Sequence, residues 1–167
     1  ERDIALRLQR FGLLPLRHAG FAHRLRACEV TAETATRAYL ERIEILDPHL
    51  DAYECVMADK ALETARAVDR LLAAGTDLGP LMGVPVSVKD LFAIKGTPTT
   101  AGSNLDLADL IGTEGSFVGT LRRAGCVILG KTRMPEFAMG SVGGHGVVSF
   151  LRGAPRNPWD AKTHRAP

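Results

Sequence analysis

The hydrophobic pattern changes its period along this chain, and that change sets the fold class. Apolar residues recur every three or four positions over 31–46 and again over 59–74, which predicts two amphipathic helices. Over 84–89 three valines alternate with other residues, and the segment ends in Lys89, which predicts a strand with a lysine at its carboxyl end. We therefore expect helices and strands to share one fold of the α/β class.

A second strand is predicted after a third helix. Residues 114–124 have a helical apolar face, and the continuous apolar run Cys126–Leu129, closed by Gly130, is typical of a strand buried on both faces. Strand, helix and strand in this order imply a right-handed crossover and a sheet that contains parallel pairs. The short stretch 52–57 could be a further strand.

Capping and breaking residues suggest where the helices begin and end. Thr31 is a candidate N-cap for the first helix, and Pro48 is expected to stop it. Asp59 is expected to cap the second helix, which Gly75 ends as a C′ glycine. Residues 135–139 predict the start of another short helix.

Composition and charge exclude several classes of protein. The 167 residues suffice for one medium domain with a hydrophobic core, and 46% of them are hydrophobic and 24% charged. The net charge of +2 is nearly balanced, and Lys and Arg rarely run together, so neither a nucleic-acid interface nor a membrane-binding face is expected. No apolar run is long enough to cross a bilayer, and no signal segment opens the chain.

The three cysteines argue against a disulfide framework and against a zinc site. They are an odd number, lie far apart and form no CxxC pair, which fits a reducing cytoplasm. Cys126 lies in an apolar run and is expected to be a small buried core residue. The five histidines show no ligand or triad spacing, and we expect neither a metal nor a cofactor.

The two ends suggest that the chain is clipped. It begins with Glu1 instead of Met, and no helix or strand closes residues 162–167. We expect a helical segment over 1–30, with a short helix near 3–10, followed by the N-terminal part of a single larger domain over 31–167.

Two lysines end predicted strands, Lys89 and Lys131, and ligands gather beyond the carboxyl ends of strands in open α/β sheets. The ordinary interpretation is that each lysine reaches solvent or pairs with a carboxylate. Lys89 differs because apolar residues flank it on both sides, so partial desolvation should lower its pKa from about 10.4 towards neutrality, as a general base requires. The adjacent Asp90 should point to the opposite face of the strand.

Other candidate groups are weaker. Ser87 lies two residues before Lys89 on the same face, but a Ser-x-Lys pair is too common by chance to count as a catalytic dyad. The glycines of residues 140–146 do not follow a strand and open a helix as a phosphate-binding loop does, so no nucleotide site is expected.

Four segments together resemble the amidase signature family. Residues 79–90 (GPLMGVPVSVKD) resemble its "GPL-x-G-[IV]-P-hydrophobic-x-[IV]-KD" motif, and residues 121–132 (LRRAGCVILGKT) resemble its "LRxAGAVILGKT". Residues 135–141 (PEFAMGS) and 156–160 (RNPWD) are similar to two further family motifs. The order and spacing agree over roughly residues 30–167, and four motifs in register are far more specific than any one of them.

The resemblance implies a fold, a reaction and site residues. The fold would be a mixed sheet flanked by helices, of which this chain holds the N-terminal portion. The family cleaves amides with a Ser–cis-Ser–Lys triad, and Lys89 matches the triad lysine. Lys131 matches a segment associated with scaffold packing, and Met139, Gly140 and Ser141 resemble residues that line the acyl pocket.

The same resemblance leaves three functions open. The family's Gly/Ser-rich loop, with both serines and the oxyanion amides, should begin just after Pro167, so these 167 residues alone are expected to be inactive and to expose apolar strand edges. The first candidate is a stand-alone amidase that acts on a small-molecule amide, with a homodimer possible. The second is the glutamine-hydrolysing A subunit of a tRNA-dependent amidotransferase, although residues 140–156 lack the polar pattern of such subunits. The third is a non-catalytic homologue.

Overall fold

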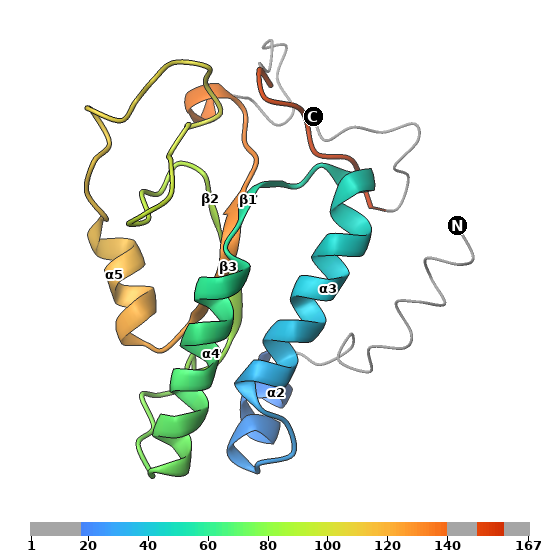
Figure 1. Cartoon of the computed structure of the whole chain (residues 1–167), viewed down its shortest axis with the longest axis vertical. Helices are drawn as coiled ribbons and strands as arrows, with labels where there is room; N and C mark the ends of the chain where they lie inside the picture. The colour runs from blue at the N-terminus through green and yellow to red at the C-terminus, as the bar shows by residue number, and fades with distance from the viewer. Residues whose placement is uncertain (1–17, 140–149, 159–167) are drawn as a thin grey trace. The chain divides into compact units, whose positions relative to one another are not determined.

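The computed structural model describes residues 18–139 and 150–158, and the helix expected near 3–10 lies outside them. In chain order the elements are α2 (His18–Arg26), α3 (Ala32–Leu50), β1 (Tyr53–Val56), α4 (Ala58–Ala73), β2 (Pro85–Lys89), α5 (Ser116–Arg123), β3 (Val127–Thr132) and the 3₁₀ turn η1 (Glu136–Ala138) (Figure 1). The strand expected over 52–57 and the helix expected over 114–124 are thereby confirmed.

The chain divides into two compact units. The first comprises the described residues up to Ile45 together with Met57–Val86 and Leu121–Leu129. The second comprises Leu46–Val56, Ser87–Thr120 and the described residues from Gly130 onward.

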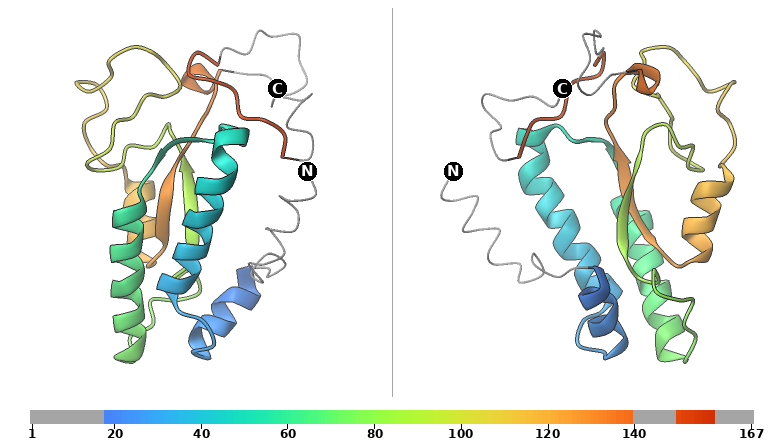
Figure 2. Two further views of the ribbon diagram at one scale, coloured as in Figure 1. Left: turned by 45° about the vertical axis from the view of Figure 1, so that its right-hand side comes forward. Right: turned by 180° about the vertical axis from the view of Figure 1, so that it is seen from behind.

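The sheet is mixed, as the family resemblance implied. Its strand order is β1-β3-β2, and β1 runs antiparallel to β3, with Cys55 opposite Lys131 and an irregularity between Tyr53 and Cys55. Figure 2 shows β2 and β3 side by side from two further directions.

Strands β2 and β3 run in the same direction, as the predicted strand–helix–strand order requires. Near their starts, the Val127 amide donates to the Val84 carbonyl at 2.9 Å. At their ends, the Asp90 amide donates to the Thr132 carbonyl at 3.0 Å. Residue numbers therefore increase together along the pair, which is the register of a parallel ladder.

Strand β3 is longer than the sequence suggested. Gly130 was expected to close it, but β3 continues through Gly130 and Lys131 to Thr132. A side chain at position 130 would overlap the Cys55 carbonyl oxygen and would lie 3.0 Å from the Val56 Cα. Gly130 therefore permits the close approach of β1 instead of ending the strand.

Small residues build the core of the first unit. Four alanines of α3 and α4 are almost fully buried, and they let the two helices run closely side by side (Figure 1). The buried members of this core are Phe21, Leu25, Ala32, Ala35, Ala61, Ala65, Val68, Met82, Val84, Val127 and Leu129. Cys126 is also buried, as predicted, with 2% of its surface exposed.

The start of α3 is capped twice. The Thr34 amide donates to Thr31 Oγ1 at 3.0 Å, which confirms Thr31 as the N-cap. In addition, the Asp69 carboxylate of α4 accepts the amides of Ala32 at 2.7 Å and Glu33 at 3.0 Å. A carboxylate at this end of the helix also opposes the positive end of the helix dipole.

The predicted end of α3 at Pro48 is wrong, because the helix includes Pro48 and ends at Leu50. A proline lacks an amide hydrogen and clashes with the carbonyl four residues earlier, but here that defect falls within the last turn. Asp47 stabilises the end of the helix beyond Pro48: its carbonyl accepts the Asp51 amide at 2.8 Å, and its Oδ1 accepts the Ala52 amide at 2.7 Å.

Helix α4 confirms one predicted end and corrects the other. Its N-cap is Met57, which makes no side-chain capping bond, so Asp59 lies in the first turn instead of capping it. At the other end, Gly75 has a φ of 79° and its amide donates to Leu72. The Thr76 amide reaches the Leu71 carbonyl, which completes the expected C′ glycine motif.

In the second unit, the loop after β2 and the helix α5 are joined by an aromatic contact. The rings of Phe92 and Phe117 lie 4.6 Å apart between centroids. Val118, one residue further along α5, is fully buried. Across the described segments, no helix combines the length and apolarity needed to cross a bilayer.

Replacing Gly130 by alanine tests the close approach of β1 and β3. We expect Gly130→Ala to lower the free energy of unfolding by about 1–3 kcal/mol, because its Cβ would collide with main-chain atoms that cannot move aside independently. Gly112→Ala is the matched control, since the nearest atom to its added Cβ lies at 3.7 Å. Equal urea-unfolding midpoints for the two variants would contradict this account of β3.

Candidate functional site

Lys89 is the last residue of β2, and its side chain is exposed in the described part of the chain. The predicted alternation is confirmed, because Val84 and Val88 are buried whereas Ser87 and Lys89 are exposed. The predicted desolvation of Lys89 by neighbouring valines is wrong for the same reason. Those valines face away from the lysine and bury the other side of the strand.

Ser87 is oriented by a hydrogen bond. Its Oγ lies 2.6 Å from the hydroxyl of Tyr53 on β1. Burial raises the pKa of the Tyr53 phenol, and the hydrogen bond with Ser87 acts in the opposite direction. A hydroxyl of fixed direction therefore stands two residues from Lys89 on the same face of β2.

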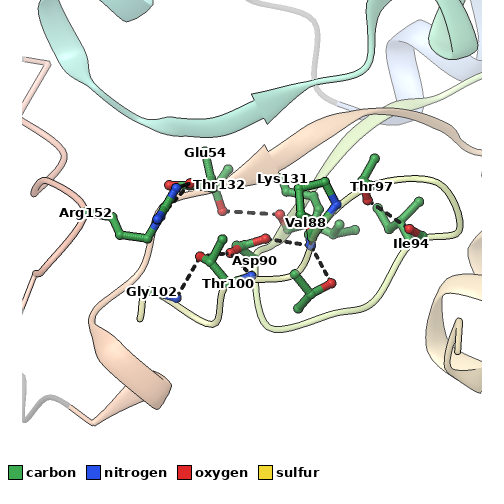
Figure 3. Close-up of polar contacts among 12 residues, drawn as sticks. Glu54, Val88, Asp90, Ile94, Thr97, Thr100, Gly102, Lys131, Thr132 and Arg152 are labelled. Atoms are coloured by element: carbon green, nitrogen blue, oxygen red, sulfur yellow. Dashed lines mark hydrogen bonds and ion pairs between the residues drawn. The ribbon is translucent and has the colours of Figure 1, made fainter. Parts of the chain in front are cut away.

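Asp90 directly follows Lys89 and lies on the opposite face, as predicted. Only 1% of its surface is exposed. One carboxylate oxygen, Oδ2, accepts the Thr100 amide at 2.9 Å and the Thr100 hydroxyl at 2.5 Å (Figure 3). The Asp90 carboxylate is thus held by a loop that starts beyond the end of β2.

Lys131 is the partner of the other carboxylate oxygen. Its Nζ lies 2.6 Å from Asp90 Oδ1, and its side chain is 0% exposed. The same ammonium donates to the Pro98 carbonyl at 2.7 Å and to the Thr99 hydroxyl at 2.8 Å. Asp90 Oδ1 accepts no well-aligned hydrogen bond, so its contact with Lys131 is an ion pair (Figure 3).

The sequence correctly placed both lysines at strand ends. It predicted that Lys89 is the partly buried one, whereas the structure buries Lys131 and leaves Lys89 exposed. The predicted pairing with a carboxylate holds for Lys131, which is the buried one of the two. The roles of Thr99 and Thr100 were missed by sequence reasoning. The signal that could have found them is the polar run that follows Gly96, where three threonines and a serine lie in a segment rich in turn residues.

A second contact fixes the same loop. Gly102, with a φ of 72°, lies where a Cβ would come within 2.5 Å of the Met134 carbonyl oxygen. The Ser103 hydroxyl donates to Glu136 Oε1 at 2.8 Å, and the Phe137 amide donates to the Ala101 carbonyl at 2.7 Å. The loop 98–103 is therefore packed against the segment that carries η1.

The candidate pocket residues are only partly covered by the structure. Phe137 and Ala138 have φ values of 48° and 59°, which is the left-handed region that non-glycine residues seldom adopt. Met139 comes next and is 74% exposed. Gly140 and Ser141 lie outside the described residues, so the structure does not bring the three predicted residues together.

Charged side chains gather at the start of β1. Glu54 is 10% exposed and lies 2.6 Å from the guanidinium of Arg152. Arg133 pairs with Asp51 at 3.0 Å, and the Arg156 amide donates to the Leu50 carbonyl at 2.7 Å. These contacts attach the described residues 150–158 to the segment around β1.

In the described part of the chain, the exposed amine of Lys89 lies at the end of β2, on the same face as the Ser87 hydroxyl that Tyr53 orients. The next residue, Asp90, is held by contacts on the opposite face of the strand. Only the neutral form of such an amine has a lone pair that can accept a proton from a hydroxyl approaching from solvent. Among the residues that the structure covers, no group of three or more His, Cys, Asp or Glu side chains could hold a metal ion.

Comparison with known protein families gives one match. Residues 34–165 match the family described as Amidase.

Two curated relatives are identical to this chain at 50% and 42% of the aligned residues. Over 134 residues, which are 80% of this chain and 26% of the relative, the chain is 50% identical to the A subunit of the glutamyl-tRNA(Gln) amidotransferase of Acidothermus cellulolyticus. Over 149 residues, which are 89% of this chain and 31% of the relative, it is 42% identical to 2-amino-5-chloromuconic acid deaminase of Comamonas testosteroni. The chain thus spans less than a third of these relatives' length.

Solved structures give the same result. The peptide amidase of Stenotrophomonas maltophilia is similar at a TM-score of 0.68 and 36% sequence identity, over 76% of this chain and 26% of that one. A bacterial aryl acylamidase of the amidase signature family reaches a TM-score of 0.74 at 28% identity, over 90% of this chain and 31% of that one.

The phenol of Tyr53 provides a test of the contact with Ser87. Ser87→Ala should raise the Tyr53 pKa further, because it removes the hydrogen bond that lowers it. Since the folded pKa already exceeds the unfolded value of about 10, the neutral phenol stabilises the fold fully below that pH. This stability is lost as the pH rises through the folded pKa.

The titration is followed by the ultraviolet absorbance of tyrosinate. Tyr53→Phe should remove the late transition, whereas Tyr39→Phe, the control, should leave it in place. An unchanged transition in Ser87→Ala would show that the two hydroxyls do not share a hydrogen bond in solution.

Proposed function

Because the chain belongs to the amidase family, we propose that its protein hydrolyses the carbon–nitrogen bond of linear, non-peptide amides and that Lys89 is the general base. The match over residues 34–165 supports the reaction class. The exposed position of Lys89 at the carboxyl end of β2 supports its role, because a base has to reach the proton it removes.

The proposed reaction proceeds through an acyl-enzyme. Neutral Lys89 accepts a proton from a cis serine, which in turn takes one from the nucleophilic serine. Both serines are expected beyond Pro167. The nucleophile then attacks the amide carbonyl, the carbon–nitrogen bond breaks, and ammonia or an amine leaves with the proton returned through the same relay. Water attacks the ester by the reverse sequence of transfers, and the acid is released.

Lys89 has to be deprotonated at the start of this cycle. An ammonium ion has no lone pair, so only the neutral amine can act as a base. The Ser87 hydroxyl, which is hydrogen-bonded to Tyr53, is a polar group on the same face of β2 as Lys89.

Substrate contacts are proposed for the residues after η1. Met139, Gly140 and Ser141 would line the acyl side of the site. A homodimer, a cytoplasmic location and the division into residues 1–30 and 31–167 remain predictions.

A second candidate function is the glutamine-hydrolysing A subunit of a tRNA-dependent amidotransferase. The 50% identity to such a protein from Acidothermus cellulolyticus favours it, whereas the 42% identity to a deaminase favours the stand-alone enzyme. Purification separates the two. A stand-alone amidase releases ammonia as a single purified chain, and an A subunit requires its partner subunits and charged tRNA for full activity.

Substitution of Lys89 in the full-length protein tests the proposed base. Lys89→Ala should lower kcat/KM for amide hydrolysis by about 10²- to 10⁴-fold, the usual range for loss of a general base. Lys89→Arg should be equally impaired, because arginine keeps the positive charge but does not deprotonate in proteins. The assay measures the release of ammonia.

Lys60→Ala, on the exposed side of α4, is the matched control and should retain parental activity. Full activity in Lys89→Ala would reject Lys89 as the base. Absence of turnover in the parent, with and without partner subunits, would instead indicate a non-catalytic homologue.

A further inference from the structure

We propose that Asp90, together with Lys131 and Thr100, is a positioning group that fixes the end of β2 and thereby the direction of the Lys89 side chain. This inference rests on the proposed function of Lys89. In this inference, the buried Asp90 and Lys131 and the half-buried Thr100 influence the efficiency of the base.

Each polar group of Asp90 is engaged. Its amide donates to the Thr132 carbonyl at 3.0 Å, and its carbonyl accepts the Ala101 amide at 3.3 Å. Its carboxylate binds the amide and hydroxyl of Thr100 through one oxygen and pairs with Lys131 through the other. The residue that follows Lys89 is therefore fixed to β3 on one side and to the loop 98–101 on the other (Figure 3).

Asp90 and Lys89 lie on opposite faces at the end of β2. Successive side chains of a strand point to opposite faces. Asp90 therefore makes its contacts on the buried face, while Lys89 stays exposed on the other face. The peptide units on either side of Lys89 set the direction of its Cα–Cβ bond, so a displacement of the backbone at residues 89–90 would move the amine away from its target. Asp90 acts through the backbone and not through contact with a reactant.

Lys131 does not itself serve as the base. Its side chain is completely buried, and its ammonium already has the Asp90 carboxylate, the Pro98 carbonyl and the Thr99 hydroxyl within 2.8 Å. Those acceptors occupy the directions from which a reactant would approach. The ammonium instead ties the loop to the carboxylate.

A buried ion pair is a costly way to gain stability, which argues for a role in orientation. Apolar residues of similar volume often replace such a pair without loss of stability, because both charges must be desolvated. The network around Asp90, in contrast, demands specific directions of donors and acceptors. Its structural effect is to allow a single arrangement of the strand end.

The experiment replaces the network in the full-length enzyme without leaving an unpaired buried charge. The double variant Asp90→Asn/Lys131→Met should fold, yet its kcat for amide hydrolysis should fall by about a hundredfold with KM changed less than about threefold, as expected of a misplaced catalytic group. Asp109→Asn, which neutralises an exposed carboxylate, is the control and should match the parent.

Thr100 provides a second test in case the double variant does not fold. Thr100→Val removes the hydroxyl at nearly constant volume and should lower kcat by about tenfold, whereas Thr100→Ser keeps the hydroxyl and should restore it. A structural role alone would not produce recovery of kcat by serine at equal thermal stability. Parental kcat in Thr100→Val would overturn the proposal.

Native-state hydrogen exchange separates this inference from the proposed function. In Asp90→Asn/Lys131→Met, the backbone N–H groups of residue 90 and Ala101 should exchange about tenfold faster, or more, than in the parent. This effect does not depend on whether the protein hydrolyses a substrate. If the parent proves inactive, the proposed function fails, and the exchange rates alone show whether Asp90, Lys131 and Thr100 fix the end of β2. Unchanged exchange at both amides would overturn the inference.

Discussion

The ion pair between Asp90 and Lys131 joins three segments at one point: the end of β2, the end of β3 and the loop 98–101. Both charges are removed from water, at an effective cost of several kcal/mol for each ion. The close contact and the hydrogen bonds from Thr100 to Asp90 and from Lys131 to its two other acceptors offset that cost. Since removal of one partner from such a pair costs about 3–5 kcal/mol, the two residues are energetically inseparable.

Close backbone approaches form the second constraint in this part of the chain. Gly130 lets β1 lie against β3, and Gly102 lets the loop 98–103 lie against Met134. Neither contact depends on a large apolar side chain. The second unit therefore combines its buried apolar residues, such as Val88 and Val118, with charges, hydrogen bonds and close backbone approaches, whereas the core of the first unit is apolar packing between alanine-rich helices.

The sequence predicted which face each strand residue occupies, but not what covers that face. Alternation placed Val88 and Lys89 on opposite sides of β2 correctly, since it follows from backbone geometry alone. It did not reveal that Lys89 is exposed or that Asp90 pairs with Lys131, because those depend on residues distant in sequence. The predicted stops at Pro48 and Gly130 failed for a related reason: a local rule states a preference, and tertiary contacts override it.

Lys89 and Lys131 differ in whether a reactant can reach the amine, and this difference favours Lys89 as the base. The Lys131 ammonium is enclosed by the Asp90 carboxylate, the Pro98 carbonyl and the Thr99 hydroxyl, which occupy the directions from which a reactant would approach. Lys89 lacks that enclosure within the described residues and stands where a hydroxyl can reach it. In the proposed reaction, a bound acyl group would displace water from Lys89, and exclusion of water strengthens every interaction that the amine then makes. Proton transfer would thereby depend on substrate binding, and the anchored strand end would ensure that the amine is correctly directed when the substrate arrives.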